Sequence, residues 1–143
     1  MADEANQIRV RLVTPERTLF DHPADAVELP SLSGYLETLY GAAPLMAELG
    51  AGDVTIHGGP EGKDALARYN VSWGFAEVLP DRVTILANDA LKPEEIDVRR
   101  AEEQLDRGLQ MWREAGDSEA AYDDALRVIA EAEAKMASAA QKG

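Results

Sequence analysis

The chain has 143 residues, 45% of them hydrophobic, and a formal net charge of −13. This length suits about one domain, or a small β domain with an appendage, and the hydrophobic content predicts that the chain folds. The acidic charge argues against nucleic acid as a partner and against adsorption to anionic lipid, because both depend on Lys and Arg. The lack of cysteine excludes disulfides, thiolate catalysis and Cys-based zinc sites. Residues 1–7 are too polar for a signal peptide, and no apolar stretch is long enough to cross a bilayer.

The first half of the chain is predicted to form short strands. Ile8, Val10 and Leu12 alternate with arginines, which is typical of a strand with one buried face. By the same alternation, Val71, Trp73 and Phe75 are expected to share one face. Turn signals rich in Pro and Gly separate the other expected strands, at residues 18–20, 24–29, 35–39, 54–56, 65–71 and 83–87. This spacing favours an antiparallel sandwich or barrel over a βαβ fold.

The apolar period changes across residues 86–97 from two to between three and four. Pro93 suits a first helical turn, and Glu94, Glu95 and Asp97 place negative charge at the positive end of a helix dipole. The sequence therefore predicts a β domain over residues 1–88, a helical domain over residues 89–143 and a hinge where they join.

Two amphipathic helices are expected beyond this junction. Gly116 suits the end of the first helix, and Asp117 or Ser118 suits the N-cap of the second. A short turn between such helices indicates an antiparallel hairpin, and an alanine-rich second helix buries little area. We expect the hairpin to be held together weakly. The predicted apolar stripes are Val98, Ala101, Leu105, Leu109 and Trp112, then Tyr122, Ala125, Leu126, Ile129, Ala132 and Met136.

No catalytic arrangement stands out in the sequence. His22 and His57 are too isolated to indicate a triad or a metal site. Residues 58–64 resemble a phosphate-binding loop only superficially, because the spacing is short and Asp64 replaces the required Ser or Thr, so a hairpin turn is favoured. The carboxylates of the helices read as a solvated face. We do not expect the chain to be an enzyme, and no metal site is predicted.

Four segments, in order, carry a resemblance that extends from about Ile8 to the end of the chain. Residues 10–20 resemble two opening strands, residues 29–45 a glycine-rich loop, and residues 70–78 with 83–87 a final hairpin. Residues 96–101, Ile-Asp-Val-Arg-Arg-Ala, match an Ile-Asp-x-x-Arg-Ala motif. In this order and spacing, they are similar to the epsilon subunit of F-type ATP synthases.

The resemblance implies a mainly β, α+β fold: an antiparallel ten-stranded β-sandwich followed by an antiparallel two-helix hairpin. It further implies a non-catalytic central-stalk subunit that binds the gamma subunit and the ring of c subunits, so that proton-driven rotation is coupled to ATP synthesis. The subunit would be peripheral, held at the cytoplasmic face of the cell membrane through the complex, without inserting into the membrane.

The resemblance also implies contact residues in the glycine-rich loop. The candidates for the gamma and c-ring interfaces are Ser33, Gly34, Tyr35, Tyr40, Ala42 and Pro44. This loop departs from the family pattern, which has Gly, Pro and His where this chain has Glu37, Tyr40 and Ala42. Tyr35 and Tyr40 either supply contact area in place of the lost polar group or pack within the domain.

The helical hairpin of family members can swing from the sandwich into the catalytic head, where it meets the beta subunit and blocks ATP hydrolysis. Some members bind ATP as a regulatory ligand at the motif that is here Ile96, Asp97, Arg100 and Ala101; no cofactor is required. An ordinary ion pair between Asp97 and Arg100 is the alternative reading of this motif. The second helix is rich in acids, which predicts weak inhibition.

Two other functions remain open on the sequence alone. A free-standing ATP-sensing regulator would need the motif at residues 96–101 but no stalk partners. A module that binds coiled coils would need the hairpin but not the loop at residues 33–45.

Overall fold

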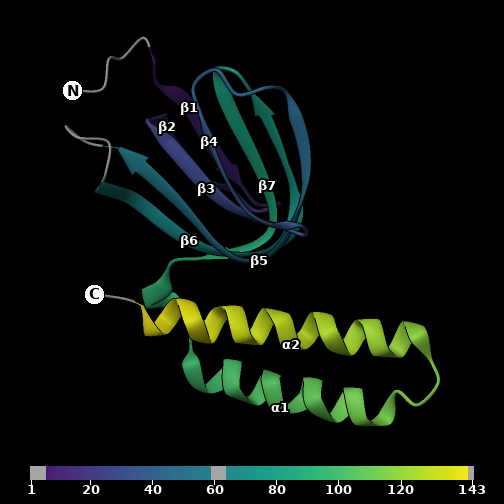
Figure 1. Cartoon of the computed structure of the whole chain (residues 1–143). Coiled ribbons are helices and arrows are strands. Elements are labelled where there is room, and N and C mark those ends of the chain that lie inside the picture. The colour runs from purple at the N-terminus through teal and green to yellow at the C-terminus, as the bar shows by residue number, and fades with distance from the viewer. Residues whose placement is uncertain (1–5, 59–63, 142–143) are drawn as a thin grey trace. The chain divides into compact units, whose positions relative to one another are not determined.

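The computed structural model describes residues 6–58 and 64–141. It divides into two compact units, Met1–Leu91 and Lys92–Gly143, which Figure 1 shows as a β unit and a helical hairpin. The units meet after residue 91 rather than after residue 88, because the last strand continues as far as Leu91. The five residues 59–63, which hold most of the predicted hairpin turn, lie outside the described residues.

Within the described residues, the β unit contains a single seven-stranded sheet with the order β2-β1-β7-β6-β5-β3-β4. Figure 1 shows this sheet curving round so that its strands enclose a common interior. The strands are β1 (Ile8–Val13), β2 (Thr18–Ala24), β3 (Ala26–Ser31), β4 (Gly34–Leu39), β5 (Leu45–Gly58), β6 (Asp64–Leu79) and β7 (Arg82–Leu91).

Two details of the predicted sandwich are wrong. The described residues form seven strands rather than ten, because β5 and β6 are long strands of 14 and 16 residues that bend without ending. The sheet is also not entirely antiparallel, since β1 pairs with β7 in parallel. All the other strand pairs among the described residues are antiparallel, so the mainly β architecture is retained.

The sheet bends at a corner where the regular pairing of β6 skips Trp73, between Ser72, which pairs with Ala51 and Asp89, and Gly74, which pairs with Leu49 and Ala87. Trp73 has a φ of 59° and Gly74 a φ of 131°, both in the region that favours glycine. Before these two residues, odd-numbered residues of β6 such as Val71 face the core. After them, the even-numbered residues do. The expectation that Val71, Trp73 and Phe75 share a face is therefore wrong, since Val71 is fully buried and Phe75 is 52% exposed.

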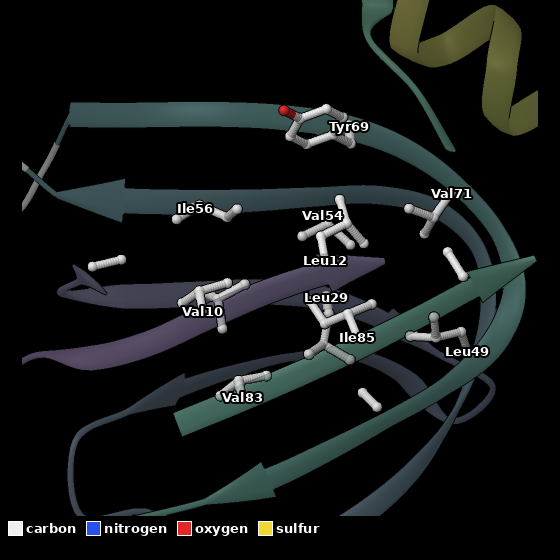
Figure 2. Close-up of a cluster of buried hydrophobic side chains, with 14 of the residues drawn as sticks. Val10, Leu12, Leu29, Leu49, Val54, Ile56, Tyr69, Val71, Val83 and Ile85 are labelled. Carbon is white, nitrogen blue, oxygen red and sulfur yellow. The ribbon is translucent and has the colours of Figure 1, made fainter. Parts of the chain in front are cut away.

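The core of the β unit is aliphatic. Figure 2 shows side chains from β1, β3, β5, β6 and β7 pointing into the space that the curved sheet encloses. Each fully buried Val, Leu or Ile contributes about 1.5–3 kcal/mol by removal from water, so this core stabilises a stiff unit. Its largest fully buried members are Ile8, Leu12, Leu29, Leu49, Ile56, Ile85, Val10, Val27, Val54, Val71, Val78 and Val83.

The second unit consists of η2 (Pro93–Glu95), α1 (Val98–Glu114) and α2 (Glu119–Ala140). Asp97 caps α1 by accepting a hydrogen bond from the Arg100 amide at 3.2 Å. Ser118 caps α2 in the same way, with the Ala121 amide at 3.2 Å. Gly116 has a φ of 57° in the turn between them. The predicted hairpin, the role of Gly116 and the Ser118 cap are confirmed.

Small buried residues allow the two helices to approach one another closely. A Cβ added to Gly108 would lie 2.8 Å from Cγ1 of Ile129, so the helices approach closely at this point. The large residues of the predicted stripes flank this seam; Val98, Trp112, Tyr122 and Leu126 are exposed. The seam repeats every seventh residue, with Ala101, Gly108 and Ala115 buried on one side and Ala125, Ala132 and Ala139 buried on the other.

Candidate interfaces and nucleotide site

The six predicted interface residues fall into two groups at opposite ends of β4. The first group is Ser33, in the turn before the strand, with Gly34 and Tyr35, the first two residues of the strand; Gly34 has a φ of 119°. Tyr40, Ala42 and Pro44 follow its other end. Six residues of strand measure about 20 Å. The two groups therefore form separate surfaces rather than one contact spot.

Tyr35 belongs to the first group and is partly fixed within the domain. Its hydroxyl accepts a hydrogen bond from the Asp53 amide at 3.0 Å, while the residue as a whole is 58% exposed. Gly52 makes room for this arrangement, since a Cβ there would lie 2.9 Å from Cβ of Pro30 and would clash with the Tyr35 hydroxyl. Tyr35 thus presents a ring of fixed position to solvent.

The second group lies at the turn that connects β6 and β7. The Gly41 amide donates a hydrogen bond of 2.7 Å to the Pro80 carbonyl, and Gly41 itself has a φ of 89°. Tyr40, Leu45 and Met46 are exposed around this link, and Met46 is 64% exposed. The exposed apolar residues continue onto the sheet from here.

An apolar surface on the outer face of the sheet was not predicted. Phe75 pairs with Leu86, which in turn pairs with Val13, so these side chains form a row across β6, β7 and β1. Phe75 and Leu86 are each 52% exposed. Met46 lies on the same face, opposite Glu77. We call Val13, Met46, Phe75 and Leu86 the side patch; the corner at Trp73 hid it, because simple alternation places Phe75 in the core.

The predicted nucleotide motif surrounds the start of α1. Ile96 and Ala101 are buried, whereas Asp97 and Arg100 are exposed. One carboxylate oxygen of Asp97 serves as the helix cap, and the described residues show no ion pair between Asp97 and Arg100. The Arg100 guanidinium is therefore available to a phosphate. The motif thus offers ATP one guanidinium and one free carboxylate oxygen, which is a partial set of contacts for a triphosphate nucleotide.

The two histidines lie on different strands of the sheet. His22 is on β2, in edge contact with the Phe20 ring, and His57 is on β5. Neither is placed with another side chain in a catalytic arrangement within the described part of the chain.

Comparison with known proteins identifies a family model that matches the β unit and relatives that extend into the helical unit. Residues 7–93 match the family model described as ATP synthase, Delta/Epsilon chain, beta-sandwich domain. The ATP synthase epsilon chain of Koribacter versatilis is 41% identical over 112 residues, which are 78% of this chain and 76% of that protein. The ATP synthase epsilon chain of Solibacter usitatus is 37% identical over 137 residues, which are 94% of this chain and 97% of that protein.

Two solved structures share the fold. The Euglena gracilis mitochondrial ATP synthase, determined as an OSCP/F1/c-ring assembly, contains a chain with a TM-score of 0.76 at 22% identity, covering 99% of this chain and 85% of that one. The central stalk/c-ring structure of Tetrahymena thermophila mitochondrial ATP synthase contains a chain with a TM-score of 0.70 at 14% identity, covering 92% and 96%.

The β-sandwich with its helical hairpin therefore defines the class of ATP synthase delta/epsilon chains. Within that class, the chain belongs to the ATP synthase epsilon chain family. It is a non-catalytic subunit of the synthase, as the sequence predicted.

Proposed function

We propose that this chain is a rotor part of the central stalk, where it couples proton-driven rotation to ATP synthesis through two interfaces. The observation that carries this proposal is the pair of separate exposed surfaces at the two ends of β4, both mounted on one stiff aliphatic core. A part that transmits torque needs rigidity and two attachment points, and an exposed apolar patch marks a place where a partner docks.

We assign the larger surface, the side patch with Tyr40 and Leu45 at its edge, to the gamma subunit. It is the more extended and more apolar of the two surfaces, which suits a lasting contact. The tip of the β3–β4 hairpin, with Leu32, Ser33, Gly34 and Tyr35, is narrow and exposed, and we assign it to the c ring. Contact with the ring would hold the chain at the cytoplasmic face of the cell membrane; among the described residues, no helix is long and apolar enough to span a bilayer.

Capture from solubilised membranes tests both assignments. The tagged chain is expected to bring down gamma and the c ring, and Phe75→Glu should release gamma because it places a charge in an apolar contact. Leu32→Glu should weaken retention of the ring. Leu66→Glu, at an exposed apolar position elsewhere on β6, is the matched control and should retain both partners. Capture of neither partner by the unaltered chain would contradict the proposal.

We also propose that ATP is a weak regulatory ligand at the start of α1. Arg100 would hold a phosphate, and the free oxygen of Asp97 would accept a hydrogen bond from the ribose or base. At about a hundred times its dissociation constant, ATP would stabilise the binding conformation by about 2.7 kcal/mol. Calorimetric titration of the isolated chain should show binding that Arg100→Ala abolishes, with Arg107→Ala as the control on the same helix.

A further inference from the structure

Three arginines gather on the outer face of β1 and β7, although the chain carries a net charge of −13. Arg9 and Arg11 alternate on β1 with buried Val10 and Leu12, and Arg82 precedes buried Val83 on β7. Figure 2 shows Val10, Leu12 and Val83 on the inner side of these strands, so the arginines point outward. We call Arg9, Arg11 and Arg82 the arginine cluster.

Like charges face one another in this cluster. Arg9 stands directly opposite Arg82 in the parallel pairing of β1 with β7, and like charges in that position are unfavourable. Asp21 forms an ion pair of 2.8 Å with Arg9 and lies opposite Arg11 in the pairing of β1 with β2. For Arg11 and Arg82, the described residues provide no ion pair. The fold therefore leaves two guanidinium groups available to a partner.

The arginine cluster adjoins the side patch on the same face of the sheet. Arg11 lies two residues before Val13 on β1, and Thr84, opposite Arg11, lies two residues before Leu86 on β7. The three arginines line one shallow depression with Asp21, Glu77 and Thr84. A partner that covers Phe75 and Leu86 would therefore reach the arginines without leaving this face.

We propose that the arginine cluster is the charged half of the interface with gamma, and that gamma places carboxylate side chains against Arg11 and Arg82. This inference rests on the assignment of the side patch to gamma. Guanidinium groups bind carboxylates through paired hydrogen bonds, which fixes the orientation of the partner as well as its distance. The apolar row would then supply contact area, and the arginines would set the alignment along the strands.

Binding of gamma to the full chain, measured against salt, tests this inference. The double variant Arg11→Gln/Arg82→Gln should raise the dissociation constant about tenfold at low salt, and the difference should shrink as salt increases. The matched control is Arg107→Gln/Arg113→Gln, which removes the same charge from exposed positions on α1. It should bind like the unaltered chain. Urea midpoints equal to that of the unaltered chain would show that neither double variant impairs folding.

The outcomes separate this inference from the proposed function. If Phe75→Ala weakens gamma binding and the arginine variant does not, the charged half is overturned and the side-patch assignment stands. If neither change weakens binding, both are overturned. Vesicles containing phosphatidylglycerol provide the third arm. If the unaltered chain binds them, and the arginine variant loses that binding but keeps its affinity for gamma, the cluster serves lipid and the inference is overturned.

Discussion

The hydroxyl of Tyr35 on β4 accepts a hydrogen bond from the amide of Asp53 on β5, across the strand that lies between them. The bond measures 3.0 Å and joins residues 18 positions apart in the chain. The edge strand β4, which pairs only with β3, is thereby also hydrogen-bonded to β5. The tip of the β3–β4 hairpin is consequently held in place although most of its surface is exposed.

Removal of this hydroxyl should loosen the edge of the sheet. Tyr35→Phe keeps the ring and is expected to lower the free energy of unfolding by about 1 kcal/mol, because the Asp53 amide loses its acceptor. Urea unfolding of the isolated chain measures this change. Capture of the c ring should survive Tyr35→Phe and fall with Tyr35→Ala. If Tyr35→Phe and Tyr35→Ala reduce capture of the c ring equally, the aromatic ring of Tyr35 does not make the contact.

The corner of the sheet should not tolerate a side chain at Gly74. A Cβ there would clash with the carbonyl oxygen of Leu86, and the φ of 131° adds strain for any other residue. We expect Gly74→Ala to lower the free energy of unfolding by about 3 kcal/mol. Gly41→Ala is the control, because Gly41 has a positive φ but open space; it should cost about 1 kcal/mol. Equal losses would mean that the clash is unimportant.

Two substitutions at Asp97 separate its capping role from its charge. Asp97→Ala should destabilise the start of α1 by about 1 kcal/mol, whereas Asp97→Asn should be nearly neutral because Asn caps as well as Asp. Amide hydrogen exchange over the first turn of α1 reports this difference. ATP binding by Asp97→Asn then tests the free carboxylate oxygen alone. Equal exchange rates in the Ala variant and the unaltered chain would contradict the capping role.

Asp21 should titrate at a lower pH than an ordinary aspartate. Its hydrogen bond from Arg9 holds its pKa below the usual 3.8. Because the folded pKa is depressed, any stabilisation is complete above the unfolded pKa, near 3.9, and is lost as the pH falls through the folded value. Arg9→Gln should return the pKa of Asp21 toward 3.8. An NMR titration of the Asp21 carboxyl measures this, with Arg17→Gln expected to leave it unchanged.

The second helix should inhibit ATP hydrolysis weakly. By the resemblance, the extended hairpin is expected to meet an acidic segment of the beta subunit. Glu119, Asp123 and Asp124 lie on the exposed surface of the first half of α2, so they would repel that segment. Deletion of residues 118–143 is expected to raise hydrolysis by the assembled synthase only slightly. The control is the same complex with the full chain at equal occupancy. A severalfold activation would contradict weak inhibition.

The sequence was most informative where one local rule governs the structure. Alternation identified β1, and glycine and N-cap preferences identified the turn at Gly116 and the cap at Ser118. It failed where the chain breaks such a rule. Trp73 occupies a conformation that favours glycine, so no propensity could reveal the corner that brings Phe75 to the surface.

Site prediction reached its limit for a related reason. The resemblance named six loop residues together, although the strand expected at residues 35–39 runs between them; the extended length of β4 places them on two surfaces. The parallel pairing of β1 with β7 joins the two ends of the β unit, and it alone brings Arg9 opposite Arg82. Contacts of this kind depend on strands far apart in the chain, which local patterns do not encode.

The small-residue seam between α1 and α2 has a consequence for how the two helices are aligned. Seven residues of helix measure about 10.5 Å, so a slide of α2 along α1 by that distance again brings a buried alanine of α2 to each place in the seam that an alanine held before. The interhelical contacts therefore admit more than one alignment, and the short turn around Gly116 selects among them. The turn, rather than the seam, therefore sets how far the C-terminal end of α2 extends along α1.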